Sequence, residues 1–265
     1  MKCLTINADD FGFTHDVNAG IVHAHLHGVL TSTTLMANGD AFEDAVRLAR
    51  QHPTLDIGCH LVLVQGASVL TGKPFPETPR DLLVALLRPR LDVYSELRAQ
   101  IEKITGAGIK PTHLDSHKHT HLLPNVFRAV VRLAHEFEIP FVRLPLDASM
   151  PFTGLPCAAA ARFYRGVAKR FHVKMTDHFL GFRLTGSLTE QSFAAALSKL
   201  PEGATEFMCH PGFLGPELQR AATRLKESRE RELEALTSPL IRQLLDAKAI
   251  RLGPFGQLGI GPKTI

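Results

Sequence analysis

Histidines concentrate in one short stretch of this sequence. The chain has 14 histidines, and four of them (His113, His117, His119 and His121) stand in the run that begins at Thr112. Imidazole is the commonest protein ligand for transition metals. Alternate histidines would share one face of a strand, whereas His117 and His121 would share one face of a helix. The stretch predicts a metal site and leaves open which histidines take part. The alternative is a polar loop.

Two adjacent carboxylates follow the first apolar segment. Asp9 and Asp10 come directly after the strand-like run Cys3–Asn7. One carboxylate of such a pair can bind a metal ion while the other accepts a proton from water. The competing interpretation is that one carboxylate caps the next helix and the other is solvated.

Three more polar residues interrupt apolar runs. His60 can be a hydrogen-bonded core residue or a metal ligand, and His210 can be a turn residue, a metal ligand or a general acid. Arg143 is a charge inside an apolar strand, and a buried arginine generally needs a carboxylate partner. We expect Asp9 or Asp115 to pair with it, either to orient a catalytic carboxylate or as a structural ion pair.

The elements that must position these residues alternate between strand-like and helical patterns, which is typical of a parallel sheet covered by helices. Gly28 ends the first helix, and Pro239 breaks the last one. The predicted strands are Cys3–Asn7, Leu30–Met36, Asp56–Val64, Thr112–Ser116, Phe141–Leu144, Thr205–Cys209 and Ile250–Leu252. The predicted helices are Val17–His27, Ala41–Gln51, Asp92–Ile104, Pro124–Glu136, Ser192–Leu200 and Arg224–Leu245, and a Pro/Gly-rich loop runs from Gly66 to Pro79.

The polar residues fall where predicted strands end. In a (β/α) barrel these ends converge on one face, where active sites lie. We therefore predict one α/β domain over residues 1–265, a closed or nearly closed barrel with its site at the C-terminal strand ends. The residues that would meet there are Asp9, Asp10, Asn38, His60, His117, Arg143 and His210.

Composition excludes several classes of protein. Hydrophobic residues make up 45% and charged residues 21% of the 265 residues, an ordinary globular balance. The formal net charge is +4, without the Lys/Arg block of a nucleic-acid-binding face. No apolar run approaches the roughly 18 residues of a membrane span. We expect a cytoplasmic protein with buried thiols at Cys3, Cys59, Cys157 and Cys209. A homodimer is compatible with the sequence.

Three charged or histidine-bearing segments favour surface roles. The segment 151–171 interleaves aromatic and basic residues, which suits either a helix packed on the barrel or an interfacial helix touching the inner membrane face. The run Arg224–Glu234 predicts a solvated helix face. His23 and His27 are four residues apart on a helix and are interpreted as solvated.

Several motifs together resemble the YdjC/ChbG carbohydrate deacetylases. The matching segments keep the family's order and cover most of the chain, except from Pro145 to about Leu200. They are Asn7–Gly12, Gly28–Thr34, Asn38-Gly39, Ile57–Leu61, Pro111–His117 and Met208–Pro211. Within the family, His60–Val64 and Thr176–Phe179 resemble the hopanoid-biosynthesis-associated branch, HpnK.

The resemblance implies a deformed (β/α) TIM-like barrel that removes acetyl from an N-acetylated amino sugar, on a hopanoid lipid if the branch applies. It implies one divalent ion bound by Asp10, His60 and His117, with His121 as the alternative to His117. The family is associated with Mg²⁺, whereas two imidazoles and a carboxylate suit Zn²⁺ by ligand type. By analogy with related deacetylases, Asp9 is the base and His210 the acid. We place Arg143 with them in the predicted catalytic set, as the residue that orients a carboxylate. The alternatives are a metal-dependent phosphoesterase, for which His117 and His119 would suit two-metal chemistry, and a non-catalytic metal-binding or sugar-binding barrel.

Overall fold

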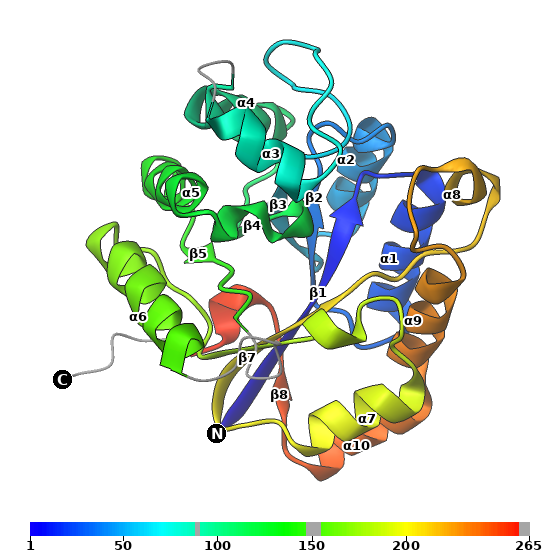
Figure 1. The fold of residues 1–265 in the computed structure, drawn as a ribbon. Coiled ribbons are helices and arrows are strands. Elements are labelled where there is room, and N and C mark those ends of the chain that lie inside the picture. Colours follow the sequence, from blue (N-terminus) through cyan, green and yellow to red (C-terminus); the bar gives the residue numbers. More distant parts are fainter. Residues whose placement is uncertain (88–90, 147–154, 260–265) are drawn as a thin grey trace.

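In the described part of the chain, eight parallel strands form one curled sheet at the centre, with helices around its outside (Figure 1). The computed structural model describes residues 1–87, 91–146 and 155–259, and only the backbone of 155–157. The strand order is β5-β4-β3-β2-β1-β7-β6, and β8 also pairs with β1. The order ends at β5 and β6, and Phe141 of β5 also forms an isolated parallel bridge with Lys174, which precedes β6 in the chain. The predicted deformed barrel is confirmed.

The strands are short except for the first, and most predicted helices are present within a few residues of their expected ends. The strands are β1 (Lys2–Phe11), β2 (Ser32–Leu35), β3 (Asp56–Leu61), β4 (His113–Ser116), β5 (Phe141–Val142), β6 (His178–Leu180), β7 (Gly203–Cys209) and β8 (Arg251–Leu252). The helices are α1 (His15–His27), α2 (Phe42–Gln51), α3 (Pro79–Leu86), α4 (Val93–Gly106), α5 (Pro124–Glu136), α6 (Leu155–Arg170), α7 (Glu190–Ser198), α8 (Pro216–Arg220), α9 (Glu227–Thr237) and α10 (Pro239–Ala247).

The central strand β1 is longer than predicted. It continues beyond Asn7 to Phe11, so Asp9 and Asp10 lie inside the strand rather than after it. Every residue from Cys3 to Phe11 is buried, because β2, β7 and β8 pair with β1 and helices cover the sheet. The register with β2 shifts between Ala8 and Phe11, where Asp10 has a φ of 71°. Irregular strand pairing and left-handed backbone are both common next to functional sites, so this end of β1 is a candidate for one.

The predicted solvated face on Arg224–Glu234 is present, because Glu227, Glu230, Arg231 and Glu234 are exposed, but the opposite face of the same helix is buried. In α9 the side chains of Ser228, Arg229, Glu232 and Leu233 are buried, because the helix packs against α1 and α7. Charges at helical spacing predicted exposure, yet two of them point into the molecule. Elements α3, α8 and β6 were not predicted. Of the four cysteines, Cys3, Cys59 and Cys209 are buried free thiols, and the side chain of Cys157 lies outside the described part.

Candidate active site

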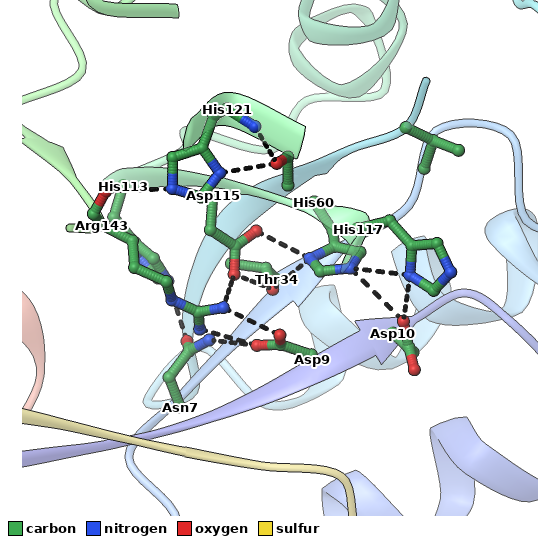
Figure 2. Close-up of polar contacts among 12 residues, drawn as sticks. Asn7, Asp9, Asp10, Thr34, His60, His113, Asp115, His117, His121 and Arg143 are labelled. Carbon is green, nitrogen blue, oxygen red and sulfur yellow. Dashed lines mark hydrogen bonds and ion pairs between the residues drawn. The ribbon is translucent and has the colours of Figure 1, made fainter. Parts of the chain in front are cut away.

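Three electron-pair donors meet at the C-terminal end of the sheet (Figure 2). Asp10 Oδ1 lies 3.3 Å from His60 Nε2 and 3.3 Å from His117 Nδ1, and the two ring nitrogens are also 3.3 Å apart. Asp10 Oδ1 is buried without a hydrogen bond of acceptable geometry. With metal–ligand bonds of about 2.0–2.1 Å, the donors of a tetrahedral site stand about 3.4 Å apart. The three residues thus fit one divalent metal ion in donor chemistry and in spacing.

Each of the three donors belongs to a side chain that is held from its far side. Asp10 Oδ2 accepts from Arg229 Nη2 at 2.5 Å. His60 Nδ1 lies 2.7 Å from Asp115 Oδ1, and His117 Nε2 lies 3.3 Å from Gln65 Oε1. Metal-binding histidines commonly donate their second ring N–H to an oxygen, which fixes the ring and its tautomer. Although burial alone would raise it, Arg229 and the two histidines hold the pKa of Asp10 well below its usual range.

A second cluster lies deeper, around Arg143. Its guanidinium donates to both oxygens of Asp9 at 2.8 and 2.7 Å, lies 2.8 Å from Asp115 Oδ2, and donates through Nε to Glu206 Oε1 at 2.6 Å. Arg143 is 1% exposed, which places it behind Asp9 rather than in the pocket. Both expected partners, Asp9 and Asp115, are present, and Glu206 is a third.

The three carboxylates around Arg143 titrate differently. Burial raises the pKa of Asp115, and it raises the pKa of Glu206 to about 7. Burial acts in the same direction on Asp9, but the bidentate contact with Arg143 outweighs it and holds the pKa of Asp9 well below its usual range. Asp9 is therefore ionised at neutral pH.

Asp9, His60 and Asp115 form a second group whose ligand atoms lie within 4.8 Å of one another. Arg143 already donates to Asp9 and lies against Asp115, so a cation is present in that group. A metal ion beside the guanidinium would be repelled by it. We therefore assign the metal-binding geometry to the first group alone.

His210 stands beside Asp9 at the end of β7. Its Nε2 is 3.9 Å from Asp9 Oδ2, and its backbone N–H donates to Glu232 Oε2 at 2.6 Å. Burial lowers the pKa of His210 to about 4, so the ring is neutral at pH 7. Its Nδ1 is buried without a hydrogen bond.

The remaining histidines of the cluster take different places. His121 uses both ring nitrogens elsewhere, with Nδ1 2.6 Å from Ser116 Oγ and Nε2 3.1 Å from the Arg143 carbonyl oxygen. The alternative in which His121 replaces His117 as a ligand is therefore not supported. His119 lines the pocket next to the ring of Phe182.

A pocket with a volume of about 480 Å³ opens above these groups. It contains the donors of the first group together with Asp9 and His210, and part of its wall is apolar. Two cations, Lys118 and Arg224, also line it. The other lining residues are Gln65, His119, Phe182, Thr185, Met208, Ala222, Thr223 and Leu225.

Sequence reasoning missed Arg229 and Glu232, which contact Asp10 and the backbone of His210. A signal was present, because both residues share one helical face with Leu225 and Leu236. Because two of these four residues are charged, the sequence did not indicate that this face is buried.

Comparison with known proteins establishes the family. The family model described as YdjC-like protein matches residues 3–247. The chain belongs to the YdjC-like family. It is 35% identical to a carbohydrate deacetylase of Brevibacillus brevis over 97% of this chain and 99% of that protein. It is 32% identical to a chitooligosaccharide deacetylase of Salmonella paratyphi C, over 96% of this chain and 98% of that protein.

Solved structures share the architecture. A protein from Enterococcus faecalis V583 superimposes with a TM-score of 0.79 at 28% identity, covering 97% of this chain and 98% of that one. A lactam utilization protein from Thermus thermophilus matches with a TM-score of 0.53 at 16% identity, covering 96% of this chain and all of that one. The second likeness concerns the fold alone.

Proposed function

We propose that this YdjC-like protein removes the acetyl group from an N-acetylated amino sugar, using one divalent metal ion bound by Asp10, His60 and His117. The family relationship makes it a hydrolase that acts on amide C–N bonds. The observation that carries the metal proposal is the triangle of donors 3.3 Å apart, each held from behind, in the same pocket as Asp9 and His210.

The metal, when bound, would acidify a water molecule and polarise the acetyl carbonyl. The residues of this chain then have separate tasks. Arg143 keeps the Asp9 carboxylate ionised and fixed in orientation. Asp9 accepts the proton of the attacking water. It can pass this proton to His210 through one intervening water or substrate atom, because the 3.9 Å between Asp9 Oδ2 and His210 Nε2 is too long for a direct hydrogen bond. An imidazolium with a pKa near 4 is a strong acid, so His210 readily protonates the leaving amine. The products are acetate and the free amine.

The donor set favours zinc over magnesium in this proposal. Two imidazoles and one carboxylate suit Zn²⁺, whereas Mg²⁺ prefers an all-oxygen set with several waters. Metal analysis of the purified protein, followed by activity of the chelated protein reloaded with each ion, tests this preference.

The finer substrate proposal is a lipid-linked glycan, as in the hopanoid branch. Residues 151–154 of the segment 151–171 lie outside the described residues. The described part of α6 exposes Arg162, Lys169 and Arg170, and the side chain of Phe163 is 44% exposed. A basic face with one aromatic residue suits a surface of anionic lipids. In the described part of the chain, no helix is long and apolar enough to cross a membrane.

Acetate release is the direct test. The substrates are soluble N-acetylglucosamine oligosaccharides and a lipid-linked N-acetylglucosaminyl glycan, each with and without chelator. Chelator-sensitive release from only the lipid-linked substrate supports the hopanoid proposal, and release from the soluble sugars supports a general carbohydrate deacetylase. His117→Ala should abolish release. His27→Ala, on the exposed end of α1, is the matched control. No acetate from metal-loaded wild-type protein would overturn the proposal and favour the phosphoesterase alternative.

A further inference from the structure

The three donors of the metal group differ in what holds them. The partners of Asp10 and His60 are Arg229 and Asp115, which are charged and buried. The partner of His117 is the neutral, half-buried side chain of Gln65. An amide oxygen can only accept a hydrogen bond, so the contact between Gln65 Oε1 and His117 Nε2 requires the hydrogen on Nε2. The lone pair of His117 Nδ1 then faces Asp10 and His60.

The backbone at Gln65 is unusual for a residue with a side chain. Its φ is 62°, a left-handed conformation that glycine adopts freely and other residues adopt at a cost. Among the described residues, seven non-glycine residues have positive φ, and four of them (Asp10, Gln65, Lys118 and His119) line the pocket. Strained backbone gathers at functional sites where a side chain must be aimed.

The loop that carries Gln65 is fixed at several points. The Gln65 N–H donates to the carbonyl oxygen of Pro76 at 2.9 Å. The buried carboxylate of Glu96 accepts from the backbone N–H groups of Val69 and Leu70 at 3.0 and 3.2 Å, and also from the Ser68 hydroxyl. The Gln65 side chain is thus presented to His117 from an anchored loop.

We infer that Gln65 is a positioning residue that selects the His117 tautomer with hydrogen on Nε2 and thereby prepares Nδ1 to bind the metal. The inference deepens the proposed function and rests on the same three ligands. The tautomer of His117 can be measured in metal-free protein, so the inference can be tested independently of metal binding.

The first experiment reads the tautomer directly. In metal-free protein labelled with ¹⁵N-histidine and held at alkaline pH, the chemical shifts of the two His117 nitrogens report which one carries hydrogen. Wild type should show mainly Nε2–H. Gln65→Gly should show a mixture, and Gln65→Glu, which keeps an acceptor, should restore the wild-type pattern. Equal tautomer populations in wild type and Gln65→Gly would overturn the inference.

The second experiment measures Zn²⁺ affinity by calorimetry with the full chain. Loss of such a supporting contact typically weakens metal binding about 10- to 100-fold. We expect that loss in Gln65→Gly, without a lower melting temperature, because glycine accepts the left-handed backbone. Gln65→Glu should bind at least as tightly as wild type. Glu138→Gly makes the same backbone change at an exposed residue with a φ of 55° and should leave affinity unchanged.

The outcomes separate the two proposals. Wild-type protein that binds no divalent ion overturns the proposed metal site, and the tautomer measurement then decides the role of Gln65. Wild-type protein that binds Zn²⁺ while Gln65→Gly binds it equally well leaves the metal site intact and overturns the inference.

Discussion

Histidines near the two ends of β4 have opposite surroundings. His113, at the N-terminal end, stacks on Phe255 with ring centroids 3.9 Å apart, and its nitrogens lie 2.8 Å from Asn7 Oδ1 and 2.9 Å from Thr112 Oγ1. At the pocket end, the nitrogens of His60 and His117 face each other and Asp10 across 3.3 Å. Both ring nitrogens of His113 have a hydrogen-bond partner, whereas the pocket end gathers three ligand atoms around one point and leaves Asp10 Oδ1 without a hydrogen bond.

The difference shows that residue type alone does not mark a functional site. Both regions contain buried histidine, but unpaired buried polar atoms line the pocket at Asp10, His119 and His210. Burial keeps the pKa of His113 well below its usual range, so that ring is a neutral structural group. Unsatisfied buried groups cost stability, and proteins retain them where binding compensates.

The largest effect should follow from removing a pocket-end donor. Asp10→Asn takes away the only carboxylate of the proposed metal group. We expect metal affinity to fall by more than about 100-fold and kcat/KM by about 10³-fold or more, since the ion supplies several kcal/mol of transition-state stabilisation. Calorimetry and acetate release measure the two quantities. Metal affinity near that of wild type would contradict the assignment.

Asp9→Asn should slow the chemical step without weakening metal binding. A general base contributes about 10²- to 10⁴-fold to a rate, and Asp9 is outside the proposed metal group. We expect turnover to fall by such a factor while Zn²⁺ affinity stays within a few-fold of wild type. A near-normal rate of acetate release would exclude Asp9 as the base.

His113→Ala tests the opposite end of β4. It leaves a cavity against Phe255 and removes the partner of Asn7, which together should cost about 2–4 kcal/mol of unfolding free energy. Metal affinity of the folded variant should not change. Chemical denaturation and calorimetry give the two values. Weaker metal binding with unchanged stability would mean that His113 supports the metal site rather than the fold, which would contradict the comparison of the two ends.

The smallest effect concerns Glu206, whose pKa burial raises to about 7. A carboxyl with a raised folded-state pKa contributes stability that is complete below its unfolded pKa and is lost as pH rises through the folded pKa. Metal-free wild type should therefore lose about 1–3 kcal/mol relative to Glu206→Gln between pH 4.5 and pH 8. Denaturation of both proteins across this range gives the contribution of Glu206 together with its effect on the neighbouring Asp9 and Asp115. Parallel stability curves would show that Glu206 is already ionised at pH 5.

Much of the fold was predictable because its signals are local. Strand and helix patterns repeat along the chain, and the break at Pro239 separates α9 from α10 as expected. The end of β1 was not predictable, since two acidic residues usually end a strand and here they continue it under cover of neighbouring strands. The burial of Arg229 depends on a contact with a residue 219 positions away. Charge patterns within one helix carry no information about such a partner.

The sequence alone determined the class of fold, the family resemblance and the set of residues from which the site is made. Local spacing and residue chemistry are sufficient for those conclusions. Only the tertiary structure decided that His121 is occupied by Ser116 and the Arg143 carbonyl, that Arg143 holds three carboxylates, and that Gln65 faces His117. These are distances between atoms on separate strands and loops, and they exist only after the barrel has curled to bring its strand ends together.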